Sequence, residues 1–380
     1  MRLNLFIFLY FFINVFSFSQ VNNPLTILDG EFILYYPNGN IMERGIVKNG
    51  LRNGEYINYY EFGQIKNKSF YINGVLNNDW VDYYSNGNVK SKCFYVSGNI
   101  MGQYINYYEN GSIQDVFNYN NNILDGDFIS YNNDGVNIIK GFYKNGLKTG
   151  IWNYYFNNGQ LEQSVNFIDG LRNGQVISYY ETGIRKSISF FIRDTFNNSF
   201  VLFYPNGRIQ QEVDFLNGLY NGRFISYNLK GFYSIKSNYK LGKIDGVHEV
   251  YLDSNKLLSI EHYSDGLKVD DAHYFHPNGN LFFKGKFKNG FKYGEWIEYF
   301  ETGVISKKCF YLDDKLNGLY IDYYNDGKIE EKGYYKNNLK DGIWKVYFYY
   351  KEDIFESEGS FKDGVKLDDW QTIKVKSIEN

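Results

Sequence analysis

Short aromatic and aliphatic segments alternate along this chain with small clusters of glycine, asparagine and aspartate. Residues 31–36 and 57–60 are typical segments, rich in aromatic and β-branched side chains and bounded by Asn-Gly pairs. No apolar stripe with a 3.6-residue period, which would indicate an amphipathic helix, occurs between the clusters. The pattern therefore predicts short β-strands joined by tight turns.

The turn residues recur every 24 residues. We call positions related by this period a phase and name each phase by its first residue. The Gly39 phase contains Gly39, Gly63, Gly87, Gly111, Gly135, Gly159, Gly183, Gly207 and Gly231. The Gly30 and Gly50 phases consist of Gly, Asn or Asp, the residue types that tolerate a left-handed backbone. About fourteen repeats follow in this way, and only the last gains two residues, near Lys351.

Aromatic residues follow half of that period. Tyr or Phe occupies every position of the Tyr35 phase, and the Val47 phase, twelve residues further on, is aromatic from Tyr71 onward. Residues 36–39 fit a type I turn closed by a left-handed glycine, and residues 48–51 fit a two-residue hairpin. Each repeat is therefore predicted to be one β-hairpin, which makes about 28 antiparallel strands in all.

Two architectures satisfy this pattern. A meander of stacked hairpins would span roughly 130 Å, and a parallel β-solenoid with one repeat per coil would span roughly 67 Å. Asn-Gly turns at both ends of the repeat favour the meander. We predict an all-β, elongated, single-layer antiparallel meander of about fourteen 24-residue hairpin repeats over residues 24–373, followed by a C-terminal tail, 374–380. The parallel solenoid stays the alternative.

The two aromatic phases should lie on opposite edges of such a meander. Strand direction alternates, so the Tyr35 phase should line one long edge and the Val47 phase the other. All five tryptophans occupy the Phe32 phase, a third aromatic row: Trp80, Trp152, Trp296, Trp344 and Trp370. The sequence leaves open which phases share a face, because a bulge near Gly54 would change that assignment.

The first residues have the pattern of a secretory signal peptide. Arg2 precedes an apolar run from residue 3 to residue 18, and Ser17 and Ser19 supply the small-x-small pattern before Gln20. A transmembrane anchor is the weaker interpretation, because the run lacks a second charged flank. We predict cleavage after residue 19 and export to the periplasm, the cell surface or the extracellular medium.

Composition excludes several classes of protein. The formal net charge of −3 argues against a bulk nucleic-acid binder, and 20% aromatic residues exclude a disordered polar chain. Two cysteines in 380 residues exclude a disulfide-stapled scaffold. Cys93 and Cys309 share a phase nine repeats apart, too far to bridge in either architecture, and are interpreted as small residues that fill a phase of mostly Gly, Ser and Val. No histidine lies within a repeat of either, so nucleophilic catalysis by these thiols lacks a base.

The four histidines of the chain all fall within 29 residues of one another: His248, His262, His273 and His276. Histidine with nearby carboxylates is the donor set of a zinc site, which makes these residues weak metal candidates. His273 and His276 are an odd number of residues apart, however, so regular strands would point them to opposite faces. We expect residues that fill drifted aromatic phases, with no metal and no other cofactor.

Basic residues recur in one phase. The members are Arg44, Lys68, Lys92, Lys140, Lys236, Lys284, Lys308 and Lys332. One interpretation is a solvated face with cross-strand charge pairs, each contributing under about 1 kcal/mol. The other is a positive row, at roughly 10 Å spacing, that binds anionic lipid headgroups or polysaccharide.

The repeat resembles a known family. The pattern G-x-Φ-x-Y-Y-x-N-G-x-Φ, in which Φ is apolar, resembles the variant MORN repeat; residues 54–63, 294–303 and 318–327 show it, and the likeness covers about residues 26–373. The original MORN spacing Y-x-G-x-W is absent. The resemblance implies an elongated sheet used for binding or scaffolding, and proteins with this variant are often described as antitoxins of the YwqK type.

These features predict an exported, non-enzymatic repeat protein that presents a long sheet to a protein partner. Repetition multiplies weak contacts along one surface, which is how quasi-one-dimensional folds bind. The alternative is the antitoxin or immunity component of a toxin–antitoxin pair. An enzyme is disfavoured, since the sequence offers no nucleophile–base pair, phosphate-cradling loop or convergent carboxylates. Nucleic acid is not expected as a partner.

Overall fold

A computed structural model describes residues 29–350 and 353–377, and these residues form 35 β-strands and no helix. No helix long and apolar enough to cross a membrane therefore occurs in this part of the chain. The chain divides into two compact units, residues 1–111 and 112–380, which we call the N-terminal and C-terminal units. The predicted signal peptide, residues 1–19, lies outside the described residues.

The N-terminal unit contains ten strands in chain order. They are β1 (Gly30–Tyr35), β2 (Ile41–Lys48), β3 (Leu51–Arg52), β4 (Gly54–Tyr59), β5 (Ile65–Ile72), β6 (Val75–Leu76), β7 (Asn78–Tyr83), β8 (Val89–Val96), β9 (Asn99–Ile100) and β10 (Gly102–Tyr107). Each long strand pairs antiparallel with the long strands before and after it, as β4 does with β2 and β5. The unit is a single-layer antiparallel meander.

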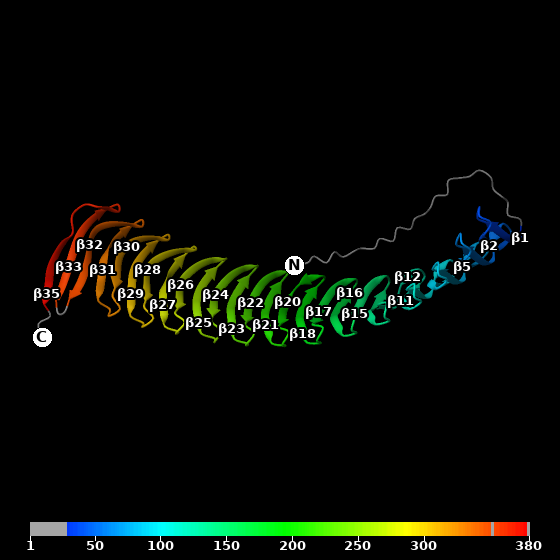
Figure 1. The fold of residues 1–380 in the computed structure, drawn as a ribbon, viewed down its shortest axis with the longest axis horizontal. Coiled ribbons are helices and arrows are strands. Elements are labelled where there is room, and N and C mark those ends of the chain that lie inside the picture. Colours follow the sequence, from blue (N-terminus) through cyan, green and yellow to red (C-terminus); the bar gives the residue numbers. More distant parts are fainter. Residues whose placement is uncertain (1–28, 351–352, 378–380) are drawn as a thin grey trace. The chain divides into compact units, whose positions relative to one another are not determined.

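The C-terminal unit continues the same pattern (Figure 1, green to red). Its strands are β11 (Ile113–Asn120), β12 (Ile123–Leu124), β13 (Gly126–Tyr131), β14 (Asn137–Lys144), β15 (Leu147–Tyr155), β16 (Leu161–Ile168), β17 (Leu171–Tyr179), β18 (Arg185–Ile192), β19 (Thr195–Phe196), β20 (Asn198–Phe203), β21 (Ile209–Leu216), β22 (Leu219–Tyr227), β23 (Tyr233–Lys240), β24 (Lys243–Tyr251), β25 (Leu257–Ser264), β26 (Leu267–Phe275), β27 (Leu281–Lys288), β28 (Phe291–Tyr299), β29 (Ile305–Leu312), β30 (Lys315–Tyr323), β31 (Ile329–Lys336), β32 (Leu339–Tyr350), β33 (Asp353–Lys362), β34 (Val365–Lys366) and β35 (Gln371–Ser377). The predicted C-terminal tail begins at residue 374, whereas β35 runs to Ser377.

The antiparallel pairing decides between the two predicted architectures. Consecutive strands pair with opposite directions within each unit, so the meander is confirmed and the parallel solenoid is wrong. Lys48 pairs with Leu51 around Asn49 and Gly50, which both have positive φ, as the two-residue hairpin requires. The Gly39 amide donates to the carbonyl of Tyr36 at 2.9 Å, which closes the predicted type I turn.

The number of strands exceeds the predicted 28 because the first strand of several repeats is interrupted. In β17 the three residues 173–175 lie opposite Asn166 alone, since Arg172 pairs with Phe167 and Val176 pairs with Val165. This irregularity falls at the Gly30 phase, where the backbone is left-handed, as at Gly174. The bulge adds two residues to one strand, so side-chain parity is conserved across it.

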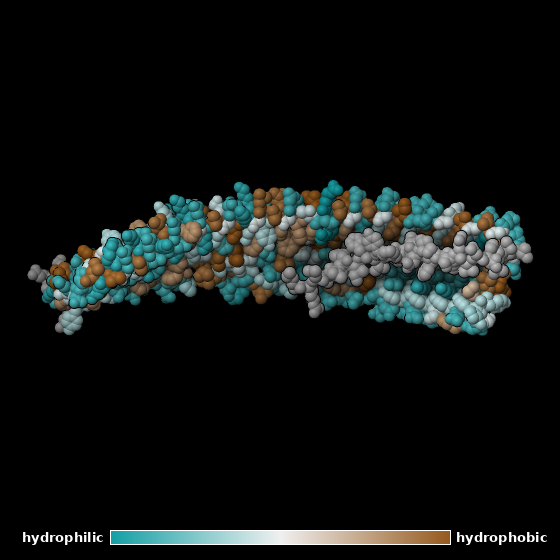
Figure 2. Space-filling model, turned by 90° about the horizontal axis from the view of Figure 1, so that it is seen from above, coloured by the Kyte–Doolittle hydropathy of each residue, from teal (hydrophilic) through white to brown (hydrophobic). Residues whose placement is uncertain are grey.

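Each unit has two unlike faces, which the register defines. We call the face that carries Tyr56, Ser69 and Tyr71 the tryptophan face, because the Phe32 phase lies on it. The opposite face, which carries Ile57 and Lys68, is called the lysine face. All buried apolar side chains of the described residues except Ile57 belong to the tryptophan face, including Trp152, Trp296 and Trp344. Figure 2 shows that many hydrophobic side chains nevertheless stay at the surface among hydrophilic ones.

The two long aromatic rows occupy opposite edges, as predicted, and also opposite faces. Tyr59 ends the first strand of its hairpin on the lysine face, and Tyr71 ends the second strand on the tryptophan face. A third aromatic row links neighbouring repeats. Side-chain hydroxyls of the Tyr36 phase donate to main-chain carbonyls 23 residues further on, as Tyr60 does to Tyr83 at 2.7 Å and Tyr84 to Tyr107 at 2.8 Å.

Because these contacts join nearest neighbours, removing one whole repeat should leave the N-terminal unit folded. Deletion of residues 79–102 joins Asn78 to Gln103 in phase and lets Tyr60 donate to the carbonyl of Tyr107 in place of Tyr83. We expect an unchanged β-sheet circular-dichroism signal per residue and a cooperative thermal transition. Deletion of residues 79–98, which breaks the phase, is the control and should abolish cooperativity. Loss of folding in both variants would contradict the modular interpretation.

Candidate functional site

The tryptophan face is held together by an interlock of tryptophan, glycine and lysine. Trp152 lies over Gly141 on the preceding strand, where a Cβ atom would come within 2.2 Å of the indole. The Lys148 ammonium lies 4.1 Å from the centre of the Trp152 ring, in a cation–π contact. Burial lowers the pKa of Lys148. Trp296 with Gly285 and Lys292, and Trp344 with Gly333 and Lys340, repeat the arrangement. This face is therefore mostly occupied by the packing of the fold itself.

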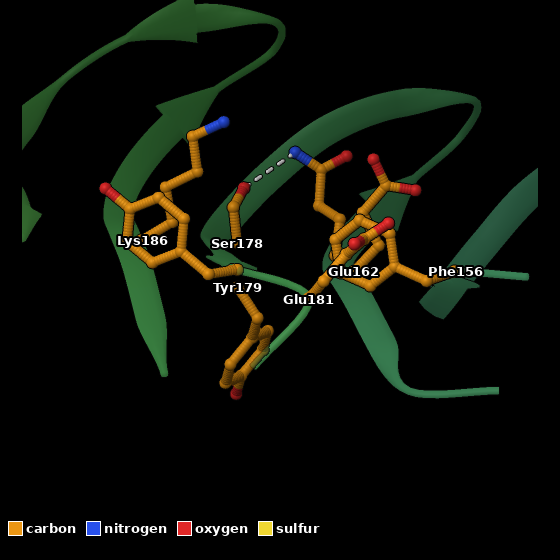
Figure 3. Close-up of a pocket in the computed structure, with 8 residues that line it drawn as sticks. Phe156, Glu162, Ser178, Tyr179, Glu181 and Lys186 are labelled. Atoms are coloured by element: carbon orange, nitrogen blue, oxygen red, sulfur yellow. Dashed lines mark hydrogen bonds between the residues drawn. The ribbon is translucent and has the colours of Figure 1, made fainter. Parts of the chain in front are cut away.

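A hollow of about 390 Å³ opens near one edge of the C-terminal unit (Figure 3). It is lined by residues of β16, β17 and β18 and of the turns after β15 and β17: Phe156, Glu162, Gln163, Ser178, Tyr179, Tyr180, Glu181 and Lys186. The Gln163 amide donates to the Ser178 hydroxyl at 3.1 Å, and Lys186 lies on one side of Ser178 with Phe156 and Glu162 on the other. Sequence reasoning missed this hollow, although the 24-residue recurrence of Phe156 and Tyr180 marks two of its three aromatic residues.

The predicted basic row lies on the lysine face but is not continuous. In the N-terminal unit, Arg44, Lys68 and Lys92 alternate across the strands with Ile57 and Val81. Lys284, Lys308 and Lys332 alternate in the same way with Ile297 and Ile321. Successive basic residues of the row are therefore two strands apart, which corresponds to about 9.6 Å.

Two members of the row are isolated from the others. Lys140 faces Ile129 and Asn153, and Lys236 faces Ile225 and Glu249. Lys236 also lines a second hollow, of about 270 Å³, and its ammonium lies 3.6 Å from the centre of the Tyr233 ring. The structure thus brings the row together in two groups of three, and the role of either group stays a prediction.

The four histidines are distributed over both faces. His248 lies on the tryptophan face in register with Glu261, whereas His262 and His273 lie on the lysine face. No group of three or more His, Cys, Asp or Glu side chains positioned to hold a metal ion occurs in residues 29–350 and 353–377. His276 takes the place of a Tyr36-phase tyrosine, since its Nε2 donates to the carbonyl of Tyr299 at 2.9 Å.

One expectation about catalysis needs correction. No nucleophile–base pair is expected from the sequence, yet the Ser237 Oγ lies 2.6 Å from the Nδ1 of His248. The pairing was missed because the two residues are neighbours only through the strand register. Burial lowers the pKa of His248. Ser237 is buried as well, with 5% of its surface exposed. Ser237 shares its phase with Ser69 and Ser189, which are also buried, and most positions of this phase hold small side chains, with Phe117 and Glu261 as exceptions.

A buried carboxylate lies beside this pair. Glu261, on β25, accepts hydrogen bonds from Lys268 at 2.6 Å and from Tyr263 at 2.8 Å, and also from the hydroxyl of Tyr274. Burial alone would raise the pKa of Glu261, but these donors and the charge of Lys268 lower it below the usual value. The carboxylate is therefore engaged with these three donors and holds this part of the face together.

Both cysteines are free, and both are buried. Cys93 lies opposite Trp80, and Cys309 lies opposite Trp296. Burial raises the pKa of the Cys93 thiol to about 12 and that of the Cys309 thiol to about 11. Thiols in this state are poor nucleophiles at neutral pH.

The thiols should consequently react only when the chain unfolds. At pH 8 we expect less than one tenth of the two thiols to react with Ellman's reagent within the time in which free cysteine reacts fully, because the thiolate is scarce and covered. In denaturant, both should react at the rate of free cysteine. Rapid reaction of either thiol in the native chain would contradict its placement in the core.

Comparison with known proteins agrees with the repeat geometry. Six segments match the MORN repeat variant. They are residues 28–49, 52–73, 76–97, 148–169, 292–313 and 316–337. Residues 52–73, for example, extend from the end of β3 through β4 and β5 into the next turn, so a MORN-variant segment corresponds to one hairpin of this fold. The predicted resemblance is thus confirmed for these six hairpins.

No curated protein matches the chain. Among solved structures, the chain is similar to one in "Crystal Structure of TcdB2-TccC3-Cdc42", with 9% identity, a TM-score of 0.13 and coverage of 90% of this chain and 27% of that one. It is also similar to a chain in "Structure of Photorhabdus luminescens Tc holotoxin pore, Mutation TccC3-D651A", with 10% identity, a TM-score of 0.13 and coverage of 91% and 27%. This chain thus spans about a quarter of the length of each.

Proposed function

We propose that this chain is an exported, non-enzymatic repeat protein whose sheet binds a protein partner. The observation that carries the proposal is repetition: residues of one phase return to the same face in successive hairpins, as Lys284, Lys308 and Lys332 do. A partner that makes one weak contact per hairpin gains affinity from many hairpins at once. The MORN-variant segments support a binding surface, and the signal-peptide pattern of residues 1–19 supports export.

The absence of enzymatic activity is part of the proposal, and two observations support it. The cysteine thiols have raised pKa values, which is the reverse of an activated nucleophile. The Ser237 hydroxyl is buried beside His248, and the Glu261 carboxylate that could orient the imidazole is taken by Lys268, Tyr263 and Tyr274.

The test is capture of a partner by the chain that begins at Gln20. The tagged chain is incubated with envelope and culture-medium fractions of the cells that encode it, crosslinked mildly, and analysed by mass spectrometry. We expect one protein to be enriched, and its recovery to fall when residues 79–102 are deleted, because one repeat of contacts is lost. Recovery of no protein, or equal recovery by an unrelated β-sheet protein, would contradict the proposal.

The basic row gives a second test, which separates protein from anionic ligands. If Arg44, Lys68 and Lys92 bind anionic lipid headgroups or polysaccharide, the variant Lys68→Ala, Lys92→Ala should lose most of the binding to vesicles containing phosphatidylserine or to dextran sulfate. The variant Lys66→Ala, Lys90→Ala, which removes the same charge elsewhere on β5 and β8, is the control. Equal binding by all three proteins would exclude a specific role for the row.

We propose the antitoxin or immunity function as the alternative, on the resemblance to YwqK-type proteins. In that case a toxin domain should be encoded beside this chain, and co-expression should restore growth of cells that produce the toxin. A signal peptide on both proteins would reconcile the antitoxin with export. Absence of any toxin gene beside it would leave the binding proposal alone.

A further inference from the structure

An exposed apolar rim follows the two-residue turns of the C-terminal unit. It belongs to the Lys48 and Leu51 phases, which flank each turn and pair across it on the lysine face, as Ile168 does with Leu171 and Leu216 with Leu219. We define the rim as Leu147, Ile168, Leu171, Ile192, Leu216 and Leu219. Thr195, which pairs with Ile192, is the polar position within it and is exposed. Leu171 is half-buried, and the other five are 41% to 49% exposed. An exposed apolar surface of this kind, with one polar position in it, is typical of an interaction site.

The rim is continuous from hairpin to hairpin. The Leu147 side chain reaches toward the turn of the next repeat, where a Cβ atom on Gly170 would lie 3.5 Å from its Cδ2. Leu219 makes the same approach to Gly242, at 3.7 Å. Because successive strands are about 4.8 Å apart, apolar side chains follow one another along the rim at about that interval except at Thr195, and the three repeats from Leu147 to Leu219 cover about 29 Å.

This spacing selects the shape of the occupant. An amphipathic α-helix presents an apolar side chain every 3.5 residues on average, or about 5.3 Å, and a heptad advances about 10.5 Å against about 9.6 Å per hairpin. The mismatch reaches only about 3 Å over three repeats. A β-strand presents side chains on one face every 6.6 to 6.8 Å or so, and it loses register within one repeat.

The charges beside the rim select the chemistry of the occupant. Neither of its two phases contains an aspartate or a glutamate, and the positions of these phases that adjoin the rim hold Lys144, Lys240 and Lys243. Lys144 is paired with Asp125 at 3.0 Å, and Lys243 with Asp265 at 2.8 Å. Arg193, in a turn of the rim, and Lys240, beyond Leu219, are exposed cations. Two carboxylates lie in the same turns, and that of Asp194 is paired with Arg172 at 2.7 Å whereas Asp169 is exposed. Acidic residues beside an apolar stripe would complement this margin.

We propose that the rim binds an amphipathic helix of the partner protein, about 20 residues long, whose leucine-rich stripe is flanked by acidic residues. The helix lies across the strands of β15 to β22, with its axis along the rim. The inference rests on the proposed protein-binding function and specifies its surface and the chemistry of its partner.

The test uses synthetic helical peptides as probes. A fluorescent peptide of about 21 residues, with two leucines per heptad flanked by glutamate, is titrated against the chain that begins at Gln20, beside an isomer flanked by lysine and a scrambled peptide. We expect the glutamate peptide to bind about tenfold more tightly than the lysine isomer. The variant Leu171→Ser, Ile192→Ser should weaken binding about tenfold or more. The control Ile151→Ser, Val247→Ser removes exposed apolar side chains of the same face outside the rim and should have no effect.

Several outcomes would overturn the proposal. They are no binding of the glutamate peptide, equal binding of the three peptides, or unchanged binding by the rim variant while circular dichroism shows it folded. A dimer by light scattering that the rim variant dissociates would show that a second copy covers the rim instead. If the rim variant still captures the crosslinked partner, the rim proposal fails while the protein-binding function stands.

Discussion

Replacement of Gly141 by valine is expected to lower the free energy of unfolding by about 3 kcal/mol. Even the first added atom would lie 2.2 Å from the Trp152 indole, and Trp152 is 1% exposed, so neither side chain has room to move. The backbone φ of Gly141 is not positive, so valine can adopt it without strain. The loss of stability therefore measures the collision of the valine side chain with Trp152. The measurement is chemical denaturation followed by tryptophan fluorescence and far-ultraviolet circular dichroism.

A second substitution provides the control for this collision. The chain itself contains the arrangement Val165 with Val176 at the corresponding positions, and both are buried. The double variant Gly141→Val, Trp152→Val should therefore be more stable than the sum of its single variants by at least about 1 kcal/mol. Strict additivity of the two single substitutions would contradict the interlock of tryptophan and glycine.

Removal of the Glu261 carboxylate is expected to have the second large effect. Glu261→Ala leaves the Lys268 ammonium and two tyrosine hydroxyls without their acceptor inside the face, which should cost about 3 kcal/mol of unfolding free energy at pH 7. Breaking a buried ion pair typically costs about 3–5 kcal/mol of stability. The lower value is expected here, because the Lys268 side chain is one third exposed and can reach water. Denaturation at pH 7 measures the loss.

The same carboxylate makes stability depend on pH. The folded state lowers the pKa of Glu261 below its ordinary 4.5, so the contribution is fully present above that value and is lost as the pH falls through the folded pKa. Glu261→Gln keeps the shape but cannot ionise, and the stability difference between it and the native chain should shrink as the pH is lowered from 7 to 3. A difference that is constant over this range would show that the charge of Glu261 is unimportant.

Much of the fold could be predicted from local sequence. The turns at residues 36–39 and 48–51 were predictable because Gly39, Asn49 and Gly50 supply the left-handed backbone that those turns need. The parallel solenoid could not be excluded on local grounds alone, since both architectures use the same strands and turns. The candidate sites were predicted less well. The members of the basic row share a face because they share a phase, but the separation of Lys140 and Lys236 from the other members depends on the residues that lie between them.

The sequence by itself determined the period, the strands and the turns, because a 24-residue recurrence constrains every repeat in the same way. Only the tertiary structure decided which phases meet across strands. An irregularity of the kind seen at residues 173–175 recurs where β14 pairs with β15 and where β23 pairs with β24, and it sets the register there. The contact of Trp152 with Gly141 and the pairing of Ser237 with His248 depend on that register. These contacts join residues that are not brought together by any local propensity. They follow from the hydrogen-bond register of neighbouring strands, so they could be identified only once the strand pairing was known.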